Sequence, residues 1–251
     1  HGSGGVGGYY GGCLARAGHE VFFIARGAHL EAIQQQGLSI KSAKGDFRIE
    51  TPKSGEHCDP NFYPDLVIVA VKSWQLPEIT EEIKNYCTPS TLILPLQNGA
   101  DASDILADTL GPERVLGGLT KIFSKIEAPG VINHFTGATY IGFGEYFQDP
   151  QFQNAPDSLS DRCRNLEKEL DSTPGIDVEA FVDIQKELWR KMLIFVSTSG
   201  VGTITRTPNG VFRSIPETRE MLIQLIREIL IVGQAKKVNI GEDDYEWAIS
   251  T

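Results

Sequence analysis

The sequence predicts an α/β protein in which a Rossmann-like N-terminal domain with a mostly parallel sheet is followed by an all-helical C-terminal domain. A glycine-rich segment at residues 2–7 runs directly into a helical segment, as at the start of a dinucleotide-binding fold. Apolar runs at residues 21–25, 65–72 and 91–96 then alternate with helical segments, which is typical of a parallel sheet. Helical segments dominate from about Asp183, which is placed to cap a helix, so we expect domains at 1–182 and 183–251.

The opening segment predicts a binding loop for a dinucleotide cofactor. It reads G-x-G-x-x-G, with the residues Gly2, Ser3, Gly4, Gly5, Val6 and Gly7. Glycine lets the backbone turn tightly and approach a pyrophosphate, whose charge the N-terminus of the following helix stabilises. A glycine-rich loop can also be a simple turn, but the apolar run at 21–25 favours the cofactor interpretation. Only His1 precedes the loop, so we expect the first strand of the fold to be missing and the chain to be incomplete at its start.

Shorter patterns predict the remaining elements of the first domain. Helices are expected at 28–36, 77–86, 100–110 and 158–170, and a short strand near Val178. Two hairpins are expected, one formed by 38–41 with 46–50 and one formed by 131–135 with 139–143 around Thr136-Gly137. The polar stretch at 146–158 is expected to be a surface loop.

Composition excludes several classes of function. The chain has 251 residues, 41% of them hydrophobic and 22% charged, which is ordinary for a globular protein. Its net charge of −10 argues against nucleic acid as a partner, and no apolar stretch has the length of a membrane span or a secretory signal. The four cysteines, Cys13, Cys58, Cys87 and Cys163, lack the spacing of a metal site. We expect free thiols, no metal and a cytoplasmic protein.

Polar residues at the ends of the predicted strands are candidate cofactor ligands. Arg26 ends the second strand of the fold, where an acid would bind the ribose of NAD and an arginine accommodates the 2′-phosphate of NADP, so NADP(H) is favoured. Lys72 and Asn98 end two later parallel strands, at the sheet edge where ligands of α/β proteins bind. The alternative for Arg26 is that it is an ordinary surface arginine. The alternative for Lys72 and Asn98 is that they are ordinary turn residues.

Lys191 is the candidate for proton transfer. At about 100° per residue, Lys191, Phe195 and Ser199 share a helix face with Leu188 and Met192, and we expect this face to pack inward. A lysine on such a face is functional, or it extends its amine to the surface. The other alternative is an exposed salt bridge with Glu187, one turn earlier.

Together these residues resemble the ketopantoate reductase family, also called 2-dehydropantoate 2-reductase. The matching segments, in family order and spacing, are residues 2–11, Ile24-Ala25-Arg26-Gly27, Val71-Lys72-Ser73-Trp74-Gln75, Leu96-Gln97-Asn98-Gly99, Glu187-Leu188-Trp189-Arg190-Lys191 and residues 205–210. The resemblance implies reduction of a 2-keto acid by NADPH in a dinucleotide-binding domain followed by a helical substrate domain. It implies cofactor contacts for Arg26 and Lys72, a place near the reacting centre for Asn98, and the role of general acid for Lys191. An ammonium group suits that role, because it stabilises the developing alkoxide and donates a proton.

Two departures from the family pattern leave a second hypothesis open. Phe195 and Ser199 stand where the family usually has asparagines that face the substrate, and the chain ends at Thr251, before the helix that carries a substrate-binding Ser and Glu in the family. The first hypothesis is reduction of ketopantoate to pantoate, a step of pantothenate biosynthesis, or of a related small 2-keto acid. The second is an NADPH-binding homologue with little catalysis that acts as a sensor or interaction protein. The oligomeric state stays open, with a homodimer among the options.

Overall fold

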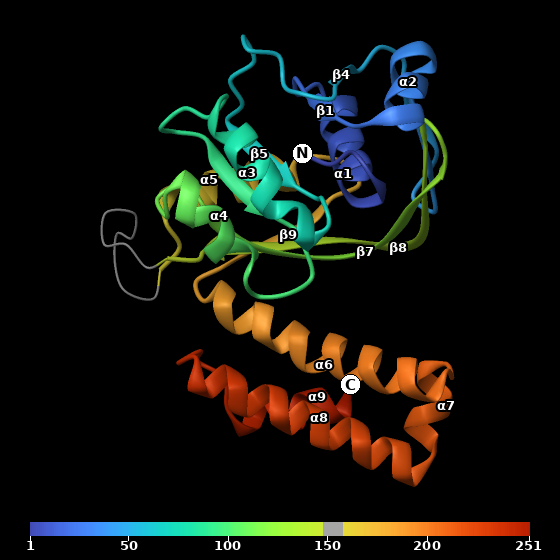
Figure 1. Ribbon diagram of the computed structural model, residues 1–251, viewed down its shortest axis with the longest axis vertical. Helices are drawn as coiled ribbons and strands as arrows, with labels where there is room; N and C mark the ends of the chain where they lie inside the picture. Colours follow the sequence, from blue (N-terminus) through green and yellow to red (C-terminus); the bar gives the residue numbers. More distant parts are fainter. Residues whose placement is uncertain (148–157) are drawn as a thin grey trace. The chain divides into compact units, whose positions relative to one another are not determined.

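The computed structural model describes residues 1–147 and 158–251, which divide into two compact units, 1–184 and 185–251. In Figure 1 the first unit runs from blue to gold and the second from orange to red. The surface loop predicted at 146–158 falls mostly on residues 148–157, which lie outside the described residues.

The three apolar runs of the first unit are parallel strands, as predicted. Strand β1 (Phe22–Ile24) pairs in parallel with β4 (Lys53–Gly55), and β5 (Leu66–Val69) pairs in parallel with β6 (Leu92–Pro95). The segment 1–3 links these pairs: the Ser3 N–H donates to Ile24 C=O at 2.8 Å and the Ala70 N–H donates to His1 C=O at 2.9 Å. The opening residues therefore lie between β1 and β5.

The first unit also contains helices, of which the first precedes β1 along the chain and the others come after it. They are α1 (Gly5–Arg16), α2 (Gly27–Gln36), α3 (Leu76–Lys84) after a short 3₁₀ turn η1 (Ser73–Gln75), α4 (Ala102–Leu110) and α5 (Asp161–Asp171). Helix α2 ends at Gly37, whose φ of 81° is readily adopted by glycine. Helix α5 begins after Ser160, whose hydroxyl accepts the N–H of Cys163 at 3.1 Å.

A second, mixed sheet packs against α1. Its strands are β2 (Leu38–Ser42), β3 (Phe47–Ile49), β7 (Leu116–Ala128), β8 (Val131–Glu145) and β9 (Asp177–Phe181), in the order β3-β2-β8-β7 with β9 also paired to β8. The hairpin of β2 and β3 is antiparallel, as predicted. The strand predicted near Val178 is β9, which pairs in parallel with β8.

The prediction of a second hairpin around Thr136-Gly137 is wrong. Residues 131–145 form one strand, β8, which pairs antiparallel with β7. The register jumps from Ile122↔Thr139 to Ser124↔His134, so the turn-like residues between them form a bulge in a long strand. The chain instead reverses at Gly130, which has a φ of 74°. Turn-forming residues occur both in hairpin turns and in bulges of a strand. Only the pairing with the neighbouring strand distinguishes the two.

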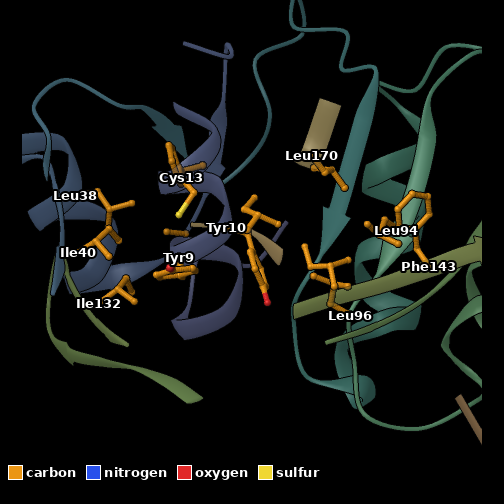
Figure 2. Close-up of a cluster of buried hydrophobic side chains, with 14 of the residues drawn as sticks. Tyr9, Tyr10, Cys13, Leu38, Ile40, Leu94, Leu96, Ile132, Phe143 and Leu170 are labelled. Carbon is orange, nitrogen blue, oxygen red and sulfur yellow. The ribbon is translucent and has the colours of Figure 1, made fainter. Parts of the chain in front are cut away.

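The main core forms around α1. Tyr9, Tyr10 and Cys13 of this helix are at most 1% exposed. Figure 2 shows these side chains between Leu38, Ile40 and Ile132 on one side and Leu94, Leu96 and Phe143 on the other. A second cluster packs α3 and α4 against β5 and β6. These buried side chains thus anchor α1 in the core.

The second unit consists of helices. They are the main part of α6 (Ile184–Thr205), then α7 (Asn209–Ser214), α8 (Pro216–Ala235) and α9 (Glu242–Ser250). A Cβ on Gly233 of α8 would come within 2.8 Å of Trp189 Cε3, so the absence of a side chain there lets α6 and α8 pack closely. Arg190 of α6 pairs with the buried Asp244 of α9, with 3.3 Å between Nε and Oδ1. Among the described helices, none combines the length and the hydropathy needed to cross a membrane.

Candidate functional site

The glycine-rich loop has the geometry of a phosphate-binding loop. Gly2 has a φ of 88°, and a Cβ on it would lie 2.7 Å from Val71 Cγ1. A Cβ on Gly7 would lie 2.4 Å from the Gly2 carbonyl oxygen, whereas one on Gly4 would meet no atom within 4 Å. The loop is therefore packed against the protein at Gly2 and Gly7 and borders open space at Gly4. Helix α1 begins at Gly5, so its first N–H groups, which lack partners within the helix, lie beside that space.

Arg26 lies close to the end of β1, at the carboxyl-end edge of the parallel strands. It follows β1 after one intervening residue, Ala25, and is the N-cap residue of α2, with extended backbone angles. Its side chain is 49% exposed, and its guanidinium pairs with Glu78 of α3, with 3.2 Å between Nη2 and Oε1. The group is thus available to a ligand, although it faces a competing carboxylate.

Lys72 and Asn98 follow the two neighbouring strands β5 and β6, and both are exposed. The Ser73 hydroxyl donates to the Asn98 carbonyl at 3.5 Å, so the two loops lie beside each other. The buried Gln97 amide donates to the carbonyls of Val69 and Val71, each at 3.1 Å, and joins the two strand ends. In the sequence, Gln97 is only one residue of a motif, and nothing in its spacing indicates this bridge.

A cavity of about 720 Å³ lies between β1 and β5, next to α1. It reaches the inner side of Gly2 and Gly7, but the described residues that line it do not include Arg26, Lys72 or Asn98. Its other walls come from residues 19–24 and 61–68, which include β1 and most of β5, and from Cys58, Tyr86 and three residues of α5, Leu166, Glu169 and Leu170. The cavity thus borders the glycine-rich loop but not the three polar residues at the strand ends.

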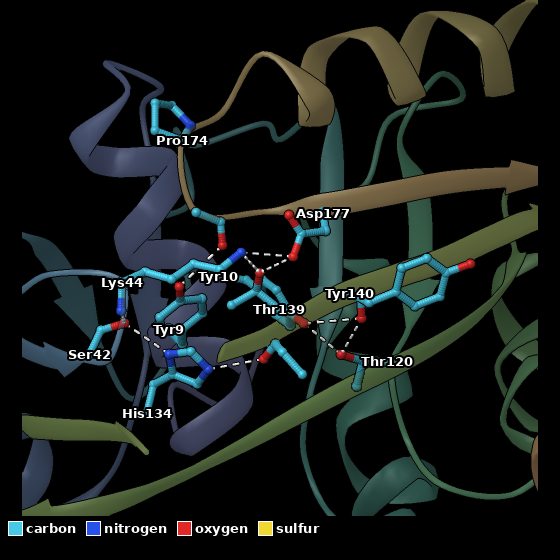
Figure 3. A network of polar contacts seen from close by, with 12 residues as sticks. Tyr9, Tyr10, Ser42, Lys44, Thr120, His134, Thr139, Tyr140, Pro174 and Asp177 are labelled. Atoms are coloured by element: carbon cyan, nitrogen blue, oxygen red, sulfur yellow. Dashed lines mark hydrogen bonds and ion pairs between the residues drawn. The ribbon is translucent and has the colours of Figure 1, made fainter. Parts of the chain in front are cut away.

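A network of polar contacts connects the strands and the loop that pack near α1 (Figure 3). Lys44 Nζ donates to Thr139 Oγ1 at 2.6 Å and to Asp177 Oδ2 at 2.7 Å, which joins β8 and β9 to the loop after β2. The bonds from Lys44 and Thr139 hold the pKa of Asp177 below its ordinary value. Tyr10 OH lies 2.6 Å from Thr120 Oγ1, and burial raises the pKa of this phenol, which stays neutral. The Cys13 thiol is also buried, and burial raises its pKa.

Lys191, Phe195 and Ser199 all lie on α6, in the second unit. The expectation that their face packs inward is wrong for Phe195 and Ser199: Phe195 is 43% exposed and Ser199 is exposed. Leu188 of the predicted face is buried, and Lys191 and Met192 are half-buried. The other buried residues of the helix are Ile184, Trp189, Leu193, Ser197 and Val201. Helix α6 carries apolar residues on most of its sides, so periodicity alone did not identify the buried face. The Glu187 carboxylate bonds to Arg190 at 3.1 Å.

The structure therefore brings one group of predicted residues together. The glycine-rich loop, Arg26, Lys72 and Asn98 lie at the carboxyl-end edge of parallel strands in the first unit. Such an edge, with an adjacent helix N-terminus, can bind the pyrophosphate and ribose of a dinucleotide. Sequence reasoning missed Glu78, which lies 52 residues from its partner Arg26 and is an ordinary first-turn acid of a helix. Among the residues that the structure describes, no group of three or more His, Cys, Asp or Glu side chains could hold a metal ion.

Comparison with known families decides the relationship. The sequence profile described as "Ketopantoate reductase PanE/ApbA" matches residues 1–146, and the profile "Ketopantoate reductase PanE/ApbA C terminal" matches residues 183–250. The chain belongs to the ketopantoate reductase family. It is therefore an oxidoreductase with a Rossmann-type domain for a nicotinamide cofactor.

Individual relatives agree with this membership. An uncharacterized oxidoreductase of Bacillus subtilis, YkpB, is 32% identical over 235 residues, which cover 92% of this chain and 72% of that protein. A 2-dehydropantoate 2-reductase of Nostoc sp. is 29% identical over 96% of this chain and 73% of its own length. The crystal structure of 2-dehydropantoate 2-reductase from Porphyromonas gingivalis superposes with a TM-score of 0.86 at 27% identity, over 99% of this chain and 85% of that one. The fold of this chain is thus that of the family in both units.

Proposed function

We propose that the protein reduces a 2-keto acid with NADPH, and that ketopantoate or a close relative is the substrate. The position of Arg26 carries the choice of cofactor. The residue lies just beyond β1, its side chain is 49% exposed, and its guanidinium can form charge-assisted hydrogen bonds with a 2′-phosphate. The first N–H groups of α1 beside Gly4 hold the pyrophosphate, and Lys72 and Asn98 contribute contacts from the neighbouring strand ends.

Lys191 is the proposed general acid. A bound NADPH supplies a hydride to the carbonyl carbon of the substrate. The carbonyl oxygen then carries developing negative charge, which an ammonium group stabilises and neutralises by donating a proton. The product is the corresponding 2-hydroxy acid. Lys191 is half-buried on α6, where less water competes for its ammonium group than at the open surface.

The test is an absorbance assay at 340 nm with the whole protein. NADPH and NADH are each supplied with ketopantoate and with other branched 2-keto acids. We expect NADPH oxidation that depends on the keto acid, with a higher kcat/KM than for NADH. Absence of turnover with every keto acid would contradict the proposal.

One observation favours the second candidate function, an NADPH-binding sensor or interaction protein. Phe195 and Ser199 replace the asparagines implied by the resemblance, and Phe195 exposes 43% of its surface. Micromolar binding of NADPH without turnover of any keto acid supports this alternative.

A further inference from the structure

His29 forms a clamp between the phosphate-binding loop and two other segments. It lies in the first turn of α2, with its Nε2 2.8 Å from the Ser3 carbonyl oxygen. The backbone N–H of Gly130, at the turn between β7 and β8, donates to its Nδ1 at 3.0 Å. The ring therefore joins residues 26 and 101 positions away in sequence.

These two contacts determine the tautomer of the ring. Because the Gly130 N–H can only donate, Nδ1 must accept and carries no proton. The proton of the neutral imidazole is then on Nε2, which donates to Ser3 C=O. Nε2 thus has one acceptor as its partner, and Nδ1 has one donor.

The clamp acts on the peptide group between Ser3 and Gly4, the glycine that borders open space. Ser3 is buried, at 7% exposed, and its N–H donates to Ile24 C=O at 2.8 Å, while its C=O accepts from His29. The peptide between Ser3 and Gly4 is trans, so the Gly4 N–H points away from the His29 ring. Holding the Ser3 carbonyl therefore also holds the direction of the Gly4 N–H, at the glycine that borders open space.

We propose that His29 is a positioning residue for cofactor binding, which holds the loop in the conformation that accepts a pyrophosphate. It touches no reacting atom. A loop that is ordered before binding loses less conformational freedom when the ligand arrives, and this raises the affinity. The inference rests on the proposed function, in that a dinucleotide is the ligand of the loop, but it holds for NADPH and NADH alike because both contain the pyrophosphate.

Two substitutions separate the halves of the clamp. In His29→Gln the amide reaches the position of Nε2 and donates to Ser3 C=O, but the contact with Gly130 is lost. In His29→Asn the carbonyl oxygen takes the position of Nδ1 and accepts from Gly130, but the contact with Ser3 is lost. The dissociation constants of NADPH, NADH and adenosine 2′-monophosphate are measured for each variant, together with Tm. Adenosine 2′-monophosphate is the control ligand, because it has a 2′-phosphate and no pyrophosphate.

We expect His29→Asn to weaken binding of both dinucleotides about tenfold and His29→Gln less than threefold, of the order expected for one hydrogen bond. Both variants bind adenosine 2′-monophosphate within twofold of the wild type. Equal weakening in the two variants, or parallel weakening of the monophosphate, overturns the proposal and makes His29 a general structural residue. Unchanged NADPH and NADH affinity in His29→Asn also overturns it.

A measurement on the unaltered protein covers the case in which a variant fails to fold. In ¹⁵N spectra of histidine-labelled protein at about pH 7.5, the His29 ring is expected as the neutral form with its proton on Nε2. A proton on Nδ1 overturns the clamp. Absence of dinucleotide binding by the wild type instead contradicts the proposed function, and the spectrum still decides the clamp geometry.

Discussion

Arg26 and Glu78 form an ion pair that links the N-terminus of α2 to the first turn of α3, with 3.2 Å between Nη2 and Oε1. Both side chains are about half exposed or more, at 49% and 64%. An exposed pair of this kind contributes only about 0.2–1 kcal/mol, so a dianionic phosphate can compete for the guanidinium. The pair places an acid beside the arginine that we propose as the 2′-phosphate ligand.

Replacing Arg26 should remove the preference for NADPH. In Arg26→Ala we expect NADPH to bind at least about tenfold more weakly, because charge-assisted hydrogen bonds to the 2′-phosphate are lost. NADH affinity should change less than twofold. Fluorescence titration of both dinucleotides checks this, and equal affinity of the wild type for the two would contradict the assignment of Arg26.

Neutralising Glu78 should have the opposite effect. In Glu78→Gln the carboxylate no longer repels the 2′-phosphate or competes for Arg26, so NADPH should bind about two- to fivefold more tightly at low salt. Glu81→Gln is the matched control, because it removes the same charge from an exposed position of the same helix. If both variants shift the NADPH affinity equally, the effect belongs to net charge and Glu78 has no specific role.

Lys191 provides a test of the proton-transfer step. Lys191→Ala should lower kcat by about 10² or more, since general acid catalysis is typically worth 10² to 10⁴ in rate. NADPH affinity should be nearly unchanged. Lys236→Ala, at an exposed position beyond α8, is the control and should keep normal kinetics. A Lys191→Ala enzyme with near-normal kcat would make the lysine an ordinary helix residue.

Phe195 should influence the choice of keto acid. A hydroxyl group placed against a phenyl ring without a partner costs about 1–3 kcal/mol, so ketopantoate should be used no better than its deoxy analogue. Phe195→Asn should shift kcat/KM toward ketopantoate. Val196→Asn, at the next residue and similarly exposed at 42%, is the control. A wild type that prefers ketopantoate tenfold, with no change in Phe195→Asn, would exclude Phe195 as a specificity residue.

His134 should make the stability depend on pH. Its Nε2 donates to Ala138 C=O at 2.9 Å, and its Nδ1 lies 2.8 Å from the Ser42 hydroxyl, which can act as donor or acceptor. Burial, with a smaller effect of Lys44, lowers the pKa of His134 below its ordinary value. The unfolded chain therefore takes up this proton at higher pH than the native protein does, and the native protein loses stability as pH falls below about 6.5.

Denaturant unfolding at about pH 5.5 and 7.5 measures this dependence. The unfolding free energy should fall on acidification by at most about 1.4 kcal/mol per pH unit, which is the contribution of one proton. His134→Gln should flatten the profile, whereas His19→Gln, at an exposed position, should leave it unchanged. A wild-type profile no steeper than that of His134→Gln would contradict the prediction.

The sequence by itself determined the features that depend on neighbours along the chain. The loop of residues 2–7, the parallel strands and the strand-end positions of Arg26, Lys72 and Asn98 follow from local turn chemistry and apolar runs, and the structure has them at one sheet edge. In a parallel sheet, all carboxyl ends lie on the same side, so a residue placed at a strand end is also placed at the site.

Only the tertiary structure decided which side of an ambiguous element is buried and which distant residues meet. Helix α6 is apolar on most of its sides, so the packing partners, and not its periodicity, select Leu193, Ser197 and Val201 as the buried face. The residues Thr136-Gly137 are a bulge because β7 continues alongside them. The contact of His29 with both Ser3 and Gly130 joins three segments whose meeting depends on chain topology, and no local pattern encodes it.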